Sequence, residues 1–241
     1  MDLSRTTLTL LGIAILVVAG WLAAQTITEA IALARGWDVR ATVPWIVGDS
    51  EDPFAYAGGV GVRAADGDGH LQLSEGGDRG LLRVSLELVE AIVLPPDGRL
   101  QSGSLTIRSR IDDEGLVGTD ALVNGATDLA ESRLPTTRAL VYGSSRFDLV
   151  LDGSTIAGGI EGTWILGHAL RKDDGAIRNQ GLVFSPLLRD DTVFSDPNRL
   201  ELTLLLYEPS EDAGTDVALH VVFRDLEVLD SPLAARIPDG S

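Results

Sequence analysis

The pattern of apolar and polar positions divides the chain into two parts. Residues 8–24, LTLLGIAILVVAGWLAA, carry no charge and no proline. As a helix they would extend about 26 Å at roughly 1.5 Å per residue, close to the thickness of the hydrocarbon core of a bilayer. The pattern therefore predicts one membrane span, preceded by a short tail over residues 1–7.

The helix is expected to continue beyond the membrane. Residues 25–35, QTITEAIALAR, place apolar side chains at helical spacing and contain no glycine or proline. Gly36 is a typical helix end, so we expect one helix over residues 8–35. Residues 36–59 are rich in turn-forming residues and are predicted to form a linker.

Short runs of alternating polarity follow from residue 60 onward. In residues 83–88, RVSLEL, the apolar side chains fall on one face and the polar ones on the other. Turn-forming residues such as PPDG at 95–98 and DG at 152–153 separate the runs. This pattern predicts an all-β fold over residues 60–241, an antiparallel β-sandwich or a jelly-roll-like domain. The same alternation marks residues 105–108, 147–151, 200–204 and 217–230.

Several places depart from this alternation. The last run changes face near Asp225, which predicts a bulge. Glu90 interrupts an apolar run, and we expect a bulge that turns it outward rather than an inward carboxyl with a raised pKa. The glycines of residues 158–162 mark a bend. Residues 113–138 are polar and poorly periodic, so they are predicted to form a long loop, with a short helix at 127–133.

Composition excludes some classes of partner. The net charge of −17 argues against a nucleic-acid partner, because a phosphate-binding face needs concentrated Lys and Arg. It also disfavours a domain lying flat on anionic lipid. The acidity fits either a GC-rich genome or adaptation to high salt. The absence of cysteine excludes disulfides, a thiolate nucleophile and cysteine-based metal sites.

A cleavable signal peptide is the alternative interpretation of the N-terminus, with Arg5 ahead of the apolar run. The nearest A-x-A site, residues 32–34, lies far beyond that run, so we expect an uncleaved anchor. A short N-terminus before one apolar helix is typical of a signal anchor. We therefore predict a single-pass protein of the cell (inner) membrane, with lipid around residues 8–24 and a periplasmic or otherwise extracytoplasmic C-terminal domain.

Small residues in the span would let neighbouring helices approach closely, and indole rings near its exit favour the membrane interface. A position in the core of the domain is an equal alternative for the two later tryptophans. The helix-packing candidates are Gly12, Ala14, Ala19 and Gly20, and the interface candidates are Trp21, Trp37 and Trp45.

One short motif suggests a metal. DGDGH at residues 66–70 resembles the start of a calcium loop, in which alternate carboxylates face a hard cation. The later acidic ligand is missing, and an acidic turn explains the run equally well, so Asp66 and Asp68 are weak calcium candidates. No other metal or cofactor is predicted, because the three histidines, His70, His168 and His220, lack the spacing of a metal motif.

Catalytic motifs are not evident. The chain contains no G-x-S-x-G, and the small residues 143–145, GSS, indicate a turn before a strand. Nothing marks a catalytic pair among the acidic residues. The glycines of 158–162 lack the strand, helix and lysine of a phosphate loop. We therefore do not expect an enzyme.

Three functions remain to be weighed. The first is a non-catalytic accessory subunit of a larger membrane complex, photosynthetic or respiratory, whose partners are other membrane protein subunits and whose β domain covers the extracytoplasmic face. The alternative is a tethered module that binds a sugar or lipid in its loops or between its sheets, with Tyr142, Trp164 and Tyr207 as stacking candidates. An anchored hydrolase ranks third.

Overall fold

The computed structural model describes most of the strand-forming part of the chain. The described residues are 36–47, 62–75, 79–95, 99–111, 117–124, 136–171, 173, 196–208 and 217–231. Within these ranges no helix has the length and apolar character needed to cross a membrane. The predicted span 8–24, with Gly12, Ala14, Ala19, Gly20 and Trp21, lies outside the described residues.

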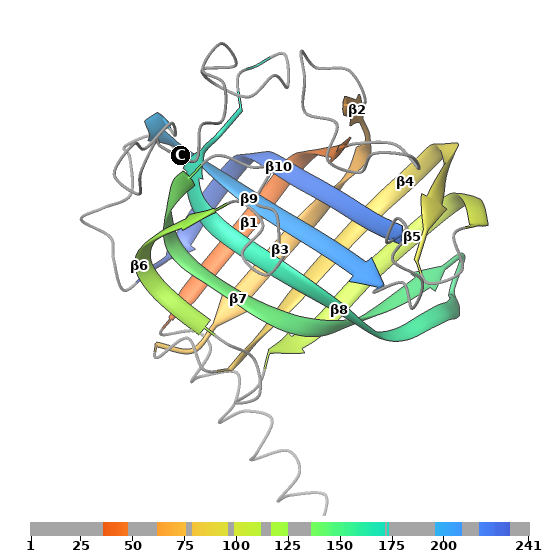
Figure 1. Ribbon diagram of the computed structural model, residues 1–241, viewed down its shortest axis with the longest axis horizontal. Helices are drawn as coiled ribbons and strands as arrows, with labels where there is room; N and C mark the ends of the chain where they lie inside the picture. Colours follow the sequence, from red (N-terminus) through yellow and green to blue (C-terminus); the bar gives the residue numbers. More distant parts are fainter. Residues whose placement is uncertain are drawn as a thin grey trace, which may run out of the picture.

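Strands account for nearly all of the described chain (Figure 1). They are β1 (Trp37–Val47), β2 (Val62–Ala64), β3 (Asp66–Leu73), β4 (Gly80–Leu94), β5 (Arg99–Ile111), β6 (Val117–Asn124), β7 (Thr136–Leu151), β8 (Ser154–Ala169), β9 (Asp196–Glu208) and β10 (Val217–Asp230).

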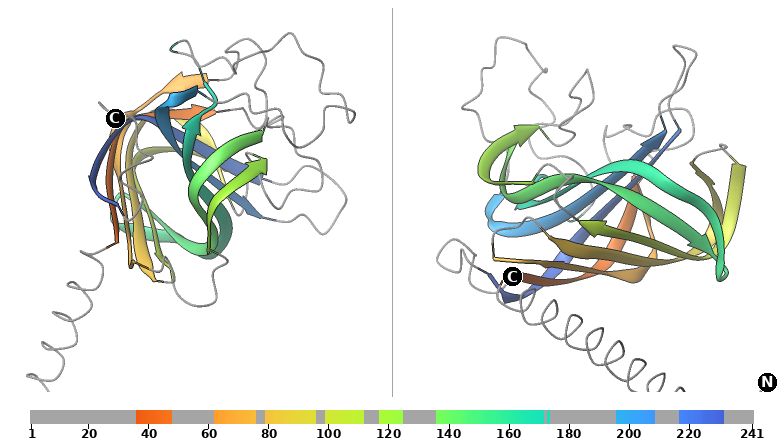
Figure 2. Two further views of the ribbon diagram at one scale, coloured as in Figure 1. Left: turned by 90° about the vertical axis from the view of Figure 1, so that its left-hand side faces the viewer. Right: turned by 90° about the horizontal axis from the view of Figure 1, so that it is seen from below.

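These strands form one antiparallel sheet that closes on itself. Neighbours follow the order β1-β3-β4-β5-β7-β8-β9-β10. β10 then pairs β1 along its length, from Asp38 opposite Asp230 to Val47 opposite His220. β2 pairs the end of β1 beside β3, and β6 pairs β7. This order is a meander, and the strands surround a central core when the fold is seen from the side (Figure 2).

The predicted all-β, antiparallel fold is confirmed. The layers that face each other across the core are parts of one continuous sheet, because β10 pairs both β9 and β1. The predicted runs 83–88, 105–108, 147–151 and 200–204 lie within β4, β5, β7 and β9, and the run 217–230 coincides with β10.

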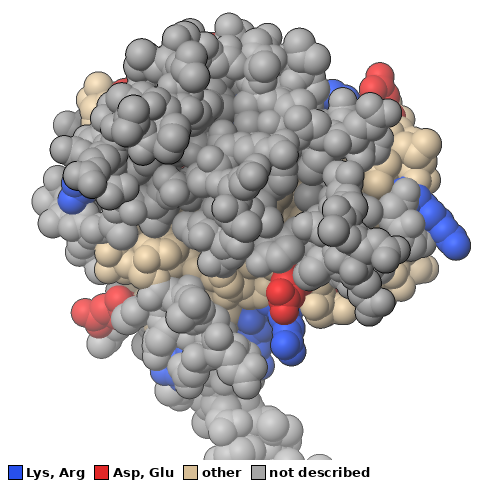
Figure 3. Space-filling view, in the orientation of Figure 1, with Lys and Arg blue, Asp and Glu red and all other residues tan. Residues whose placement is uncertain are grey.

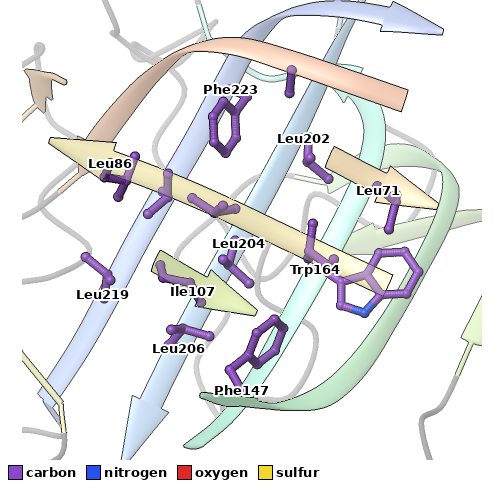
Figure 4. Packing of buried hydrophobic residues seen from close by; sticks show 14 of the residues in the cluster. Leu71, Leu86, Ile107, Phe147, Trp164, Leu202, Leu204, Leu206, Leu219 and Phe223 are labelled. Carbon is purple, nitrogen blue, oxygen red and sulfur yellow. The ribbon is translucent and has the colours of Figure 1, made fainter. Parts of the chain in front are cut away.

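Side chains that point alternately to the two faces of each strand explain the composition of the core. In β9, Leu202, Leu204 and Leu206 are fully buried and point to the inside of the closed sheet (Figure 4). Phe147 of β7 and Trp164 of β8 meet them there. Burying an apolar side chain of this size contributes about 1.5–3 kcal/mol. Large apolar side chains from all sides of the ring therefore hold the sheet closed.

β1 lies in the stretch that we predicted to be a linker. Trp37, Val39 and Ala41 alternate with polar residues and are buried in the core. Pro44 is tolerated because β1 changes neighbours there, from β3 to β2, and its carbonyl oxygen accepts a hydrogen bond from the Ala65 amide at 3.0 Å. Residues 37–47 therefore form a strand that closes the sheet, and residues 48–59 lie outside the described chain.

Part of the predicted long loop 113–138 is also a strand. β6 pairs the first half of β7, from Val117 opposite Gly143 to Asn124 opposite Thr136. β5 pairs only the second half of β7. The excursion thus adds a strand beside the ring, and the predicted helix 127–133 lies outside the described residues.

The predicted turn at residues 152–153 is confirmed as a two-residue hairpin between β7 and β8. Leu151 pairs Ser154, and both central residues have positive φ, 47° at Asp152 and 79° at Gly153. Positive φ at both positions is typical of a type I′ turn, for which Asp-Gly is a favoured sequence. Asp152 also joins the hairpin to β5, because its carboxylate accepts the Ser104 amide at 2.9 Å.

Two of the three irregularities that the sequence predicts are observed. The ladder between β4 and β5 shifts between Leu88 and Ile92, and Glu90 is exposed there, so the outward bulge is confirmed. Gly159 has a φ of 74° opposite a register shift in β7, which agrees with the predicted bend. The buried face of β10 changes between Phe223 and Leu226, at the predicted slip. The predicted bulge is not observed, because β10 stays in register with β1 from Leu226 opposite Ala41 to Phe223 opposite Pro44.

Candidate functional site

The interior of the closed sheet is occupied by large apolar side chains. Trp164, Phe147 and Phe223 are each 0% exposed and belong to the core cluster. The Trp164 indole N–H donates to Ser145 Oγ at 3.3 Å, which satisfies its one polar group inside the core. Charged side chains of both signs lie on the outer surface, as the described residues in Figure 3 show.

One break in the sheet stands out on that surface. The ladder between β9 and β10 ends where Leu202 pairs Phe223. Before this point along β9, Leu200 and Glu201 pair β8, and Asp196 pairs it again after a register shift that leaves residues 197–199 unpaired. Beyond this point along β10, residues 225–230 pair β1. We call the gap between residues 198–200 and 224–227 the β9/β10 seam.

The seam holds a cavity of about 440 Å³. This volume falls within the range of small-molecule sites. Three arginines and two carboxylates contribute to its wall, so the cavity presents both signs of charge. Its lining is Arg40 and Thr42 from β1, Asn198, Arg199 and Leu200 from β9, and Arg224, Asp225, Leu226 and Glu227 from β10.

Two of the arginines converge on a single carboxylate. Arg199 Nη1 donates to Asp173 Oδ1 at 2.6 Å, and Arg224 Nη2 donates to the same oxygen at 2.8 Å. Arg224 Nη1 also donates to the Asp173 carbonyl oxygen at 3.0 Å. The hydrogen bond from Arg199 is the main reason why the pKa of Asp173 is lowered below its ordinary value. Asp173 thus bridges the two strands that part at the seam.

Arg224 is held in place from a second direction. Its guanidinium lies 4.2 Å from the centroid of the Trp45 ring, a cation–π arrangement. Only 11% of the Arg224 side chain is exposed, compared with 33% for Arg199 and 86% for Asp173. Arg224 is therefore held by the fold, whereas the carboxylate that it shares with Arg199 is open to solvent.

A buried carboxyl group lies next to these arginines. Glu201 is two positions from Arg199 on β9 and is 4% exposed. Its Oε1 accepts the Thr203 hydroxyl at 3.2 Å, and Oε2 has no hydrogen-bond partner among the described residues. Burial raises the pKa of Glu201, and the positive charges of Arg171 and Arg224 oppose that rise.

Further polar side chains are buried on the outer face of β8–β10. Thr163, Thr203 and His220 are each less than 10% exposed, although the core-facing leucines of β9 point the other way. Burial lowers the pKa of His220 well below its ordinary value, with a smaller contribution from Arg171. His220 is consequently neutral at physiological pH.

The weak calcium candidates lie on a strand. Asp66 and Asp68 are exposed residues of β3, in regular register with β4. His70 of the same strand contacts Asp38 of β1, with 2.7 Å between Nε2 and Oδ1. No group of three or more His, Asp or Glu side chains within the described ranges is arranged to hold a metal ion.

The three histidines are distributed over different strands. His70 is in β3, His168 in β8 and His220 in β10. His168 is half-buried, and burial together with the charge of Arg138 lowers its pKa, while Asp196 opposes the shift. Residues 143–145, which we predicted to form a turn, lie inside β7.

The aromatic residues predicted as interface or stacking candidates lie in different environments. Trp37 is a core residue, 1% exposed, which matches the second of its two interpretations. Trp45 is partly buried beneath Arg224. Trp164 is enclosed by the core, and Tyr142 packs on a small cluster outside it. The side chain of Tyr207 lies outside the described part of the chain.

The arginines of the seam were not among the predicted site residues. Arg40, Arg199 and Arg224 are far apart in the sequence and belong to no motif. One signal did point to their neighbourhood, namely the loss of alternation near Asp225. There the buried face of β10 changes, next to the point where its pairing with β9 ends.

Comparison of the chain with protein-family models, with curated proteins and with solved structures finds no match.

Proposed function

We propose that this protein is a non-catalytic, membrane-anchored accessory subunit of a larger membrane assembly. Residues 8–24 would hold it in the membrane as an uncleaved anchor, and the sandwich-like closed-sheet domain would cover the extracytoplasmic face of the partner subunits. The observation that carries the proposal is the combination of this apolar segment with a domain whose interior is occupied by its own core. Contacts with partners are then made by the outer surface.

Native mass measurement tests the proposal. The full chain is extracted from its native membrane in a mild detergent and separated on a native gel, followed by mass analysis. We expect it to migrate with other membrane subunits. Migration alone, at its own 25.5 kDa plus detergent, would contradict the accessory-subunit proposal.

The small residues of the span provide a matched comparison. Gly20→Leu would enlarge a predicted helix-packing position, whereas Val17→Leu changes the volume of the same span far less. We expect the first substitution to reduce the fraction of chain found in the assembly and the second to leave it unchanged.

The seam cavity favours a second candidate, a tethered ligand-binding module. Its volume of about 440 Å³ and its convergent polar side chains are those expected of a small-molecule site. The site would lie on the outside of the sheet, and not between its layers. A ligand-induced rise in Tm of the full chain in detergent would support it, and this rise should be lost in Arg224→Gln.

A further inference from the structure

We infer that the β9/β10 seam binds a small zwitterion, whose carboxylate replaces that of Asp173 between Arg199 and Arg224 and whose cationic end faces Asp225 and Glu227. This inference rests on the second candidate function, the tethered ligand-binding module, and names its ligand.

The position for the carboxylate is already defined by the chain itself. Arg199 and Arg224 approach one oxygen of Asp173 to 2.6 Å and 2.8 Å, so the two guanidiniums are spaced to share a carboxylate. They come from strands that are no longer paired to each other, and the contact of Arg224 with Trp45 fixes one side of the pair. Arg224 therefore needs little reorganisation to accept a carboxylate from a ligand, and Arg199 keeps the same kind of partner.

Asp173 is a weak occupant of this position. Its side chain is 86% exposed, and an ion pair that is open to solvent contributes little net free energy because water screens it. A ligand that also fills the adjacent cavity gains contacts that Asp173 does not make, since Asp173 is not part of the cavity wall. Displacement of Asp173 by such a ligand is consequently favourable.

The charge of the cavity wall favours a zwitterion, because away from Arg199 and Arg224 it carries two carboxylates and one arginine, Arg40, which stands opposite Glu227 in the ladder between β1 and β10. Asp225 and Glu227 line the same cavity as the arginines and are exposed. They would repel the second charge of a phosphate or a dicarboxylate, whereas a cationic group at the far end of a carboxylate would be attracted to them. Both signs of charge in the wall thus match both signs in the ligand.

A set of three compounds of equal chain length tests the inference. Binding of 4-aminobutyrate, butyrate and butylammonium to the full chain in detergent is measured by calorimetry. We expect 4-aminobutyrate to bind most tightly and its affinity to increase by about tenfold in Asp173→Ala, because the internal competitor is removed. The gain should disappear when Arg224→Gln is added, and it should remain when the exposed Arg83→Gln of β4 is added as a control.

Other outcomes would overturn the inference. These are equal binding of butyrate and 4-aminobutyrate, no gain in Asp173→Ala, or binding that survives Arg199→Gln and Arg224→Gln together. Circular dichroism of each variant establishes that it is folded. Failure of this test while an uncharged compound still binds the seam would leave the ligand-binding function standing, and the native-mass experiment is independent of both.

Discussion

Glu201 is a residue whose burial determines how stability depends on pH. Its pKa is raised above the ordinary value of 4.5, so the folded state binds the proton more tightly than the unfolded state. The stabilisation by the protonated acid is complete below pH 4.5 and is lost as the pH rises through the raised pKa. At neutral pH, Glu201 therefore lowers the free energy of unfolding.

Glu201→Gln tests this expectation, because glutamine resembles the protonated acid. We expect equal unfolding free energies for the two proteins at pH 4 and a more stable variant at pH 7, because the glutamine carries no buried charge. Urea titrations at the two pH values measure the difference. Glu161→Gln, at an exposed position of β8, is the matched control and should show no such change. A variant less stable than the parent at pH 7 would mean that attraction to the charges of Arg171 and Arg224 outweighs the cost of burial.

The residues of the seam show why the candidate site could not be predicted from the sequence. Arg40, Arg199 and Arg224 have no fixed spacing, and an arginine in an alternating run has an ordinary explanation as an outward-facing side chain. Asp173 lies in a run of acidic and glycine residues that predicts only a turn. Their meeting depends on where two strands part, which alternation does not encode.

At the scale of elements, the hairpin between β7 and β8 depends on the left-handed conformation of Gly153. Its φ is 79°, and a Cβ atom added there would meet nothing within 4 Å. The cost of a substitution is therefore a backbone cost alone. We expect Gly153→Val to lower the free energy of unfolding by about 1–2 kcal/mol, because a β-branched residue disfavours this region.

Gly153→Asn is the matched comparison, since asparagine tolerates positive φ. It should cost a fraction of the valine effect in the same denaturant titration of the full chain. Equal losses for the two variants would indicate that side-chain size, and not φ, limits this turn.

The strands differ in how well the sequence predicts them. β10 was predicted with its observed bounds, because its alternation is long and uninterrupted by glycine or proline. β1 was missed, because Gly36 and Pro44 outweighed the short alternation of Trp37 to Ala41. Those two residues are compatible with a strand only because of tertiary context: β1 begins directly after Gly36 and exchanges one neighbour for another at Pro44.

At the scale of the whole molecule, closure of the sheet is the feature least accessible from sequence. It requires pairing between β1 and β10, which come from opposite ends of the described chain. Local alternation predicts that each is a strand but not which strand it pairs. The same alternation fits an open two-layer sandwich and a closed meander, so the class all-β was predictable and the closed order was not.

The net charge of −17 leads to the last prediction, which concerns salt. There are 36 acidic and 19 basic side chains, so like charges repel one another over the surface of the folded protein. Raising NaCl from about 0.01 M to 1 M shortens the Debye length from about 30 Å to about 3 Å and removes most of this repulsion. We expect Tm of the full chain in detergent to rise by about 2–4 °C for each kcal/mol of repulsion that is screened.

Charge variants separate screening from other effects of salt. Glu87 and Glu90 are exposed on β4, and their joint replacement by glutamine should reduce the dependence of Tm on salt. Arg83→Gln on the same strand should increase it, because it adds to the negative excess. Cooperative unfolding that persists at 0.01 M NaCl would favour a GC-rich genome as the origin of the acidity, whereas loss of the folded state there would favour adaptation to high salt. A Tm independent of salt in all three proteins would show that the charges are too far apart to repel.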